Sequence, residues 1–195
     1  MLYCIAKKLP HNLHYINDLK KLINIAINKK LLEREEKFMD ISVMIDNIKF
    51  NYRVATIIKN DNKILLHKCK TDNFYALPGG RVMIGEDSET ALKREFEEEM
   101  GAKIFIKDYL GTIENFFEYS GTKYHEIMIV YESTFDSHSD FYEKEKIVGL
   151  EENGKIEFIW ETIDEIPKLD LRPLFLKERI ISNTKIDHLI NNDAK

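Results

Sequence analysis

The sequence predicts an α/β (or α+β) domain, in which helices flank a mixed β-sheet, together with an N-terminal helical extension. Three observations indicate this class. Segments rich in β-forming residues lie on both sides of one central amphipathic helix, and a second helix closes the chain. The first glycine is Gly79, and residues 16–38 follow a helical period instead. The 195 residues suffice for one domain of ordinary size plus an appendage, and they contain no internal repeat.

Residues 16–38 are expected to form one helix. Apolar residues from Ile16 to Ile27 recur at steps of three or four, with charged residues between them. We therefore divide the chain into an N-terminal helical extension of unknown role, residues 1–38, and a main domain, residues 39–195. The apolar stripe must be buried against the domain or against a second copy, which leaves a homodimer open. A protein that interacts with partners mainly through this helix is a further alternative.

The strands of the main domain follow from β-forming residues and the turns between them. Asn60, Asp61 and Asn62 separate the first two strands, which is a hairpin signal. Gly121 marks a second turn. The expected strands cover 50–59, 63–68, 103–111, 113–119, 123–132 and 155–162. The closing helix is expected over 171–180, with Pro173 in its first turn.

Composition excludes several classes of function. The formal net charge of −5 provides no basic surface for duplex nucleic acid. No apolar run approaches the roughly 18 residues of a membrane span, and the first residues do not resemble a signal peptide. Cys4 and Cys69 lack metal-ligand spacing, which favours reduced thiols and a cytoplasmic location. An anionic small molecule is still compatible with the charge, because a metal ion supplies positive charge locally.

The central helix collects glutamates on the face that should pack against the sheet. Asp87 is a suitable N-cap, and Gly101 is suited to the position after the last turn. At about 100° per residue, Glu95 and Glu99 fall on the apolar face, whereas Glu97 lies on the opposite side. The remaining glutamate of the run, at position 98, lies at the margin of the apolar face, beside the arginine at position 94.

A bound cation explains this arrangement better than a solvated acidic helix. Like charges among Glu95, Glu98 and Glu99 cost roughly 0.2–0.5 kcal/mol per pair, and each carboxylate near a helix C-terminus costs roughly 0.3–1 kcal/mol more. Partial burial adds a desolvation cost. A divalent cation reverses the sign of these effects, and three carboxylates suit a hard ion such as Mg²⁺ or Mn²⁺.

The stretch GRVMIGEDSETALKREFEEEMGA, from Gly80 to Ala102, resembles the signature of the Nudix (MutT-like) hydrolases. That signature is Gly, five residues, Glu, seven residues, and then Arg-Glu-apolar-any-Glu-Glu-any-Gly-apolar. Every fixed place is filled, by Gly80, Glu86, Arg94, Glu95, Phe96, Glu98, Glu99, Gly101 and Ala102. We call this stretch the Nudix box. The resemblance extends over roughly residues 40–180 and leaves the first 38 residues unexplained.

The resemblance implies an α/β/α sandwich with a central mixed sheet. It also implies an enzyme that cleaves the diphosphate linkage of a nucleoside diphosphate derivative by attack of water on phosphorus. Glu95, Glu98 and Glu99 would hold Mg²⁺ or Mn²⁺, and the carbonyl of Gly80 would assist. The alternative is a nucleotide-sensing module that kept the fold without catalysis, but the intact box favours the enzyme.

Further roles follow from the same resemblance. Arg94 would be structural and would pair with a glutamate such as Glu86. Glu98 or Glu99 would take the proton from water, unless the base lies outside the box. Glu126, on the strand 123–132, is then the candidate, although an exposed strand carboxylate is the simpler interpretation. Four other glutamates compete with it, namely Glu143, Glu145, Glu151 and Glu152. The neighbouring His125 is expected to pack or to form hydrogen bonds.

Substrate recognition is left open by the sequence. Arg53 and Arg81 would contact phosphates, or would form surface ion pairs. The aromatic residues Phe116, Phe117 and Tyr119 would stack a base, or would belong to the core. Tyr119 lies 17 residues after Ala102, a placement that resembles dinucleoside-polyphosphate hydrolases. The proline that ADP-ribose pyrophosphatases carry at about that distance is absent.

Overall fold

The computed structural model describes residues 39–150 and 154–193. The helix expected over 16–38 lies outside the described residues, and so do Glu151 and Glu152. No helix within the described ranges is both long enough and apolar enough to cross a membrane.

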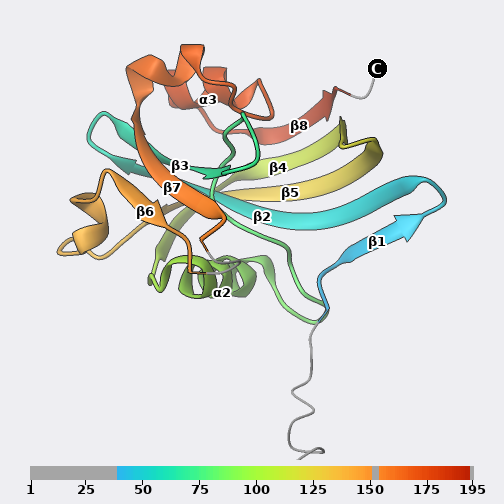
Figure 1. Cartoon of the computed structure of the whole chain (residues 1–195), viewed down its shortest axis with the longest axis horizontal. Helices are drawn as coiled ribbons and strands as arrows, with labels where there is room; N and C mark the ends of the chain where they lie inside the picture. Colours follow the sequence, from blue (N-terminus) through green and yellow to red (C-terminus); the bar gives the residue numbers. More distant parts are fainter. Residues whose placement is uncertain (1–38, 151–153, 194–195) are drawn as a thin grey trace, which may run out of the picture. The chain divides into compact units, whose positions relative to one another are not determined.

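Eight strands form the sheet of this domain, in the order β6-β7-β3-β2-β5-β4-β8, with β1 paired to β2 (Figure 1). The pairs β2–β5 and β4–β8 are parallel and the others are antiparallel, which confirms the predicted mixed sheet. The strands are β1 Ser42–Ile45, β2 Ile48–Asn60, β3 Lys63–Cys69, β4 Phe105–Tyr119, β5 Thr122–Thr134, β6 Lys146–Val148, β7 Ile156–Thr162 and β8 Asp187–Asn192. The helices are α2 Ser88–Met100 and α3 Leu176–Ser182, with short 3₁₀ turns at Asp140–Tyr142 and Ile163–Lys168.

The predicted β2–β3 hairpin forms, but its two strands separate almost at once. They are paired only at Lys59–Ile64 and Asn60–Lys63. Beyond those pairs, β2 continues beside β5, whereas β3 continues beside β7. The domain therefore contains two groups of strands that share one hairpin turn, and a gap opens between β2 and β3.

The segment that leads into the Nudix box fills this gap. Ala76 exchanges backbone hydrogen bonds with His67 of β3, both at 2.9 Å. On the other side, the N–H of Val54 in β2 donates to the carbonyl of Gly80 at 2.9 Å. Gly79 has a φ of +142°, and a Cβ there would overlap the backbone of Val54, so only glycine fits this close approach. The segment 76–80, which contains Gly79 and Gly80 and is called the glycine loop below, is thus held by backbone hydrogen bonds at both of its ends.

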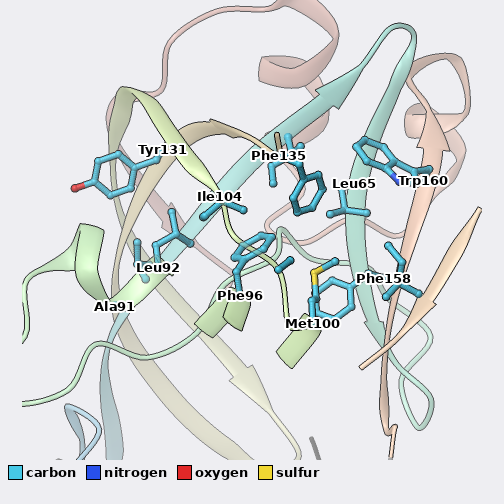
Figure 2. Packing of buried hydrophobic residues seen from close by; sticks show 14 of the residues in the cluster. Leu65, Ala91, Leu92, Phe96, Met100, Ile104, Tyr131, Phe135, Phe158 and Trp160 are labelled. Carbon is cyan, nitrogen blue, oxygen red and sulfur yellow. The ribbon is translucent and has the colours of Figure 1, made fainter. Parts of the chain in front are cut away.

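Hydrophobic clusters cover both faces of the sheet. Successive side chains of β2 point to opposite faces of the sheet. Val54 and Ile58 therefore belong to one cluster, and Ala55 and Ile57 belong to the other. The first cluster packs α2 against the sheet and contains Leu92, Phe96, Met100, Phe135 and Phe158 (Figure 2). The second packs α3 and the preceding segment through Leu171, Leu176 and Ile180. This arrangement confirms the predicted helix–sheet–helix layers.

The predicted break between the strands 103–111 and 113–119 is wrong, because both belong to β4. Register shifts against β5 occur between Ile106 and Asp108, and between Tyr109 and Gly111. Gly111 adopts a φ of +152°, and a Cβ there would overlap the backbone of β8. The glycine therefore permits close approach of a neighbouring strand instead of ending its own.

The closing helix was predicted to begin too early. It starts at Leu176 instead of residue 171, and Pro173 lies in the turn before it, where its carbonyl accepts from the N–H of Leu176 at 3.1 Å. A residue before proline is disfavoured in the α conformation, which explains why Arg172 does not belong to the helix. The strands β1, β6 and β8 were not predicted, since they are short and β8 is largely polar.

Candidate active site

Helix α2 begins and ends where the sequence placed it. The carboxylate of Asp87 accepts hydrogen bonds from the N–H groups of Glu89 and Thr90, both at 3.0 Å. Gly101 adopts the left-handed conformation, with a φ of 65°. Glu99 is buried with the apolar residues of the helix, whereas Glu97 and Glu98 are exposed. The helical-face analysis therefore agrees with the structure for all three side chains.

Arg94 uses all five of its N–H groups within the box. Nε and Nη2 bind the two carboxylate oxygens of Glu86 at 2.9 and 3.0 Å. Nη1 binds Glu95 at 2.9 Å and Glu98 at 2.8 Å, and Nη2 also donates to the carbonyl of Arg81 at 2.9 Å. Burial opposes the charge of this guanidinium, but the hydrogen bonds and charges of the three glutamates raise its pKa above the usual range. The arginine joins the start of the box to its helix.

Glu95 is held between this arginine and the glycine loop. Its carboxylate lies where the Cβ of any residue other than glycine at position 80 would be, so a larger residue there would displace that carboxylate. Burial raises the pKa of Glu95, and the charge of Arg94 partly offsets that shift. Because the Gly80 carbonyl already accepts from Val54, it keeps one lone pair for another partner.

Within residues 39–150 and 154–193, no group of three or more acidic, His or Cys side chains is already arranged around one point as metal ligands. The Nη1 of Arg94 donates to carboxylate oxygens of both Glu95 and Glu98. The donor chemistry nevertheless fits a hard divalent cation: three carboxylates of one helix, those of Glu95, Glu98 and Glu99, border a common cavity.

The cavity has a volume of about 630 Å³ and brings most of the predicted site residues together. It is bordered by the box, by the separated strands β2 and β3, and by β4 and β5. Among the predicted residues, it is lined by Gly80, Arg94, Glu95, Glu98, Glu99, Arg53, Arg81 and Glu126. Glu86 does not line it and instead lies behind Arg94.

Arg53 and Arg81, the two arginines expected to contact phosphates, differ in their contacts. Arg53 lies in β2, and its Nη2 donates to the carbonyl of Gly79 at 2.9 Å, so it also supports the glycine loop. Arg81 pairs with Asp40 at 3.2 Å, and both side chains are about two-fifths exposed. The contact of Arg81 is the surface ion pair that the sequence left open, although the residue still borders the cavity.

Glu126 is not an exposed strand carboxylate, since only 6% of its surface is accessible. Asn115 of β4 donates to its Oε1 at 3.3 Å, and Asn51 of β2 lies at the same register on its other side. Both asparagines are buried and line the cavity, and sequence reasoning missed them. The period of two along β2 could have indicated Asn51, which shares a face with Arg53.

Two histidines take different positions. His125 points to the other face from Glu126 and packs between Phe50 and Phe116, as the sequence suggested. His67 of β3 was not singled out from the sequence, although it lines the cavity. Burial, with a smaller effect of the Arg53 charge, lowers the pKa of His67 to about 3. His67 is therefore neutral at physiological pH and offers a hydrogen-bonding group without charge.

The aromatic candidates do not belong to the buried core. Phe117 stacks on Tyr124 at 4.7 Å between ring centroids, and both line the cavity. Tyr119 contacts the edge of Phe74 at 6.0 Å and donates a hydrogen bond to Asp72 at 2.9 Å. Aromatic rings therefore line the end of the cavity that lies near the turn between β4 and β5.

The fold and this site define a known family. The family model of the NUDIX domain matches residues 49–179, and the chain belongs to this family. A curated relative, the ADP-ribose pyrophosphatase of Methanocaldococcus jannaschii, is 37% identical over 95 residues, which cover 47% of this chain and 51% of the relative. The chain thus aligns with about half the length of that relative.

Solved structures share the fold. The MutT protein from Methanosarcina mazei Go1 aligns with a TM-score of 0.53 and 21% identity, over 72% of this chain and 98% of that one. A NUDIX hydrolase from Nitrosomonas europaea aligns with a TM-score of 0.53 and 16% identity, over 73% and 79%. At these identities the likeness concerns the fold alone, and it supports the predicted Nudix-type sandwich.

Proposed function

We propose that this protein is a metal-dependent hydrolase that cleaves the diphosphate linkage of a nucleoside diphosphate derivative by attack of water on phosphorus. The observation that carries the proposal is the complete Nudix box, whose Glu95, Glu98 and Glu99 border one cavity together with Arg53. The 37% identity to a protein named as an ADP-ribose pyrophosphatase supports the same class of reaction.

The box glutamates and Gly80 have distinct proposed roles. Glu95, Glu98 and Glu99 would hold Mg²⁺ or Mn²⁺, with the carbonyl of Gly80 as a further oxygen ligand. When bound, such an ion neutralises phosphate oxygens and lowers the pKa of water. Glu98 or Glu99 would accept the proton of the attacking water. These assignments rest on the shared cavity and on the oxygen-only donor set.

The remaining residues would position the box and the substrate. Arg94 and Glu86 would act structurally, because their paired hydrogen bonds fix the start of the box against α2. Arg53 and Arg81 would contact the phosphates. Glu126 was considered from the sequence as an alternative base, and its place in the polar floor of the cavity supports a second role, argued below.

A substrate screen tests the reaction class. We expect turnover of at least one nucleoside diphosphate derivative in the presence of Mg²⁺ or Mn²⁺, and none of simple phosphomonoesters. ADP-ribose, sugar nucleotides, dinucleoside polyphosphates and nucleoside triphosphates form the panel, and released phosphate or pyrophosphate is measured after phosphatase coupling where needed. Turnover of a phosphomonoester with none of any diphosphate compound would contradict the proposal.

The same screen separates the alternative of a nucleotide-sensing module, which would bind panel members without hydrolysing any of them. A small-molecule nucleotide is thus the proposed partner under either reading. The cytoplasmic location and the lack of a duplex nucleic acid partner are proposed on charge and cysteine content alone.

Removal of residues 1–38 is expected to leave a folded and active domain. Residues 39–195 contain the whole Nudix box and both hydrophobic clusters described above. Circular dichroism, activity on the best panel substrate and light scattering of the two forms measure the effect. A change in oligomeric state would assign the homodimer contact to the extension, whereas an insoluble or inactive short form would place the domain boundary before residue 39.

A further inference from the structure

A row of polar side chains crosses four neighbouring strands, and its three buried members line the floor of the cavity. Asn51 of β2, Glu126 of β5, Asn115 of β4 and Asn191 of β8 occupy matching register positions, and these strands lie side by side (Figure 1). We call these four residues the polar row. Asn51, Asn115 and Glu126 are each no more than 6% exposed. A polar row in this position needs hydrogen-bond partners, since burial without them is costly.

The hydrogen bonds within the row run in one direction. Asn191 Nδ2 donates to Asn115 Oδ1 at 2.8 Å, and Asn115 Nδ2 donates to Glu126 Oε1 at 3.3 Å. A carboxylate can only accept, so the amide orientation of Asn115 is fixed by its neighbour. At the other end, the hydroxyl of Ser42 donates to Asn51 Oδ1 at 2.7 Å. The amide oxygens of Asn51 and Asn115 are therefore both occupied by donors of the protein.

Two groups of the row are left for a ligand. Within residues 39–150 and 154–193, Glu126 Oε2 and Asn51 Nδ2 have no hydrogen-bond partner, and both residues line the cavity. They belong to adjacent parallel strands at the same register, so their side chains are neighbours roughly 5 Å apart along the sheet. The row thus presents an acceptor that carries negative charge beside a neutral donor.

The polar row lies between the arginine end of the cavity and its aromatic end. Along β2, Arg53 lies on the side of the glycine loop, Asn51 follows at the next inward position, and Lys49 comes after it. Phe117 and Tyr124 stand beside the Lys49 position on the neighbouring strands, where Lys49 approaches the Tyr124 ring at 5.8 Å. The proposed function places the phosphates at the box and at Arg53. The polar row therefore faces the part of the ligand that follows the phosphates.

We propose that Glu126 and Asn51 determine substrate specificity by binding an uncharged ligand group that offers a hydrogen-bond donor beside an acceptor. This inference rests on the proposed function, since it takes the diphosphate to lie at the box. Two parts of a nucleotide have this chemistry, namely a ribose hydroxyl and the hydrogen-bonding edge of a base. Glu126 then acts through ligand binding instead of taking a proton from water.

The test uses binding of nucleotides that cannot be hydrolysed at the linkage. Isothermal titration of the full chain with α,β-methylene-ADP, in Mg²⁺, gives a reference Kd. One arm replaces it by the 2′-deoxy and 3′-deoxy compounds, and a second arm exchanges adenine for guanine, cytosine or uracil. We expect at least one arm to weaken binding by roughly tenfold or more, because a hydrogen bond to a carboxylate is lost. A loss in the first arm assigns the row to ribose, and a loss in the second assigns it to the base.

Glu126→Gln should weaken binding of the reference nucleotide by a similar factor and remove the discrimination of that arm, as expected when the two partners of one contact are removed in turn. Glu132→Gln is the matched control, since this carboxyl lies on the same strand outside the cavity, and its Kd values should equal those of the parent. If Glu126→Gln fails to fold, the two ligand arms on the parent protein still decide the question.

Three results would overturn the inference: no binding of any of these nucleotides, no shift beyond about threefold in either arm, or full discrimination retained by Glu126→Gln. If Glu126→Gln keeps its Kd but loses hydrolysis and the acidic limb of the pH–rate profile, Glu126 is the base instead. Binding is measured without turnover, so a protein that discriminates as expected yet hydrolyses nothing refutes the proposed function alone.

Discussion

Replacement of Glu98 or Glu99 by Gln is expected to reduce hydrolysis of the best diphosphate substrate roughly 100-fold or more. Each substitution keeps the size of the side chain and removes one negative charge from the group proposed to hold the cation. Initial rates at saturating Mg²⁺ and Mn²⁺ measure the effect. Thermal melts should also show a smaller stabilisation by added metal, because binding to the folded state raises its stability.

Glu97→Gln is the control for this result, since Glu97 lies one residue away on the exposed side of α2. It should keep the activity and the metal response of the parent. From the sequence alone, Glu98→Gln is expected to leave the metal-free protein as stable as before, or slightly more stable. The ion pair of Glu98 with Arg94, at 2.8 Å, offsets that gain, so we expect a change within about 1 kcal/mol. Equal loss of activity in all three variants would refute the helical-face argument.

Arg94→Lys is expected to lower the free energy of unfolding by about 2–3 kcal/mol and to abolish most activity. Lysine has three donors at one point, whereas Arg94 satisfies five acceptor contacts in a planar fork. The largely buried carboxylate of Glu86 would lose its paired hydrogen bonds. Denaturant unfolding without metal measures the stability directly.

Lys93→Ala is the matched control for the arginine, because Lys93 is adjacent in sequence and, among the residues that the structure describes, pairs only with the exposed Glu89, at 3.7 Å. Its loss should change stability by no more than about 0.5 kcal/mol. A similar effect of both substitutions would mean that Arg94 is an ordinary surface residue, despite its contacts. Retained activity in Arg94→Lys would show that a positive charge at position 94 is sufficient for hydrolysis, without the planar set of hydrogen bonds.

Helix α2 was the most predictable element of the molecule. Its N-cap Asp87, its C-terminal Gly101 and its buried face follow from local interactions, which act within a few residues along the chain. The helical period of the same segment placed Glu95 and Glu99 on the apolar face of the helix and Glu97 on the opposite side. The contact of Arg94 with Glu86 was expected from the family resemblance, and the structure places the two side chains together.

The polar row was not predictable to the same degree. Asn51, Asn115 and Asn191 stand on strands distant in sequence, and only the strand order and register place them beside Glu126. Neither the order of the strands nor their register can be derived from one sequence alone. For the same reason β8 was missed: its residues Asp187–Asn192 have weak strand preference, and it forms against β4 through pairing that the local sequence does not encode.

The separated hairpin also sets an order for folding. The turn at Asn60–Lys63 joins neighbours in sequence and can close early, whereas β2 meets β5 only across more than 60 intervening residues. The glycine loop enters between β2 and β3, so these strands cannot complete a conventional ladder first and admit the loop afterwards. Per unit of lost stability, substitutions in the turn should therefore slow refolding at least as much as substitutions at Gly79 or Gly80.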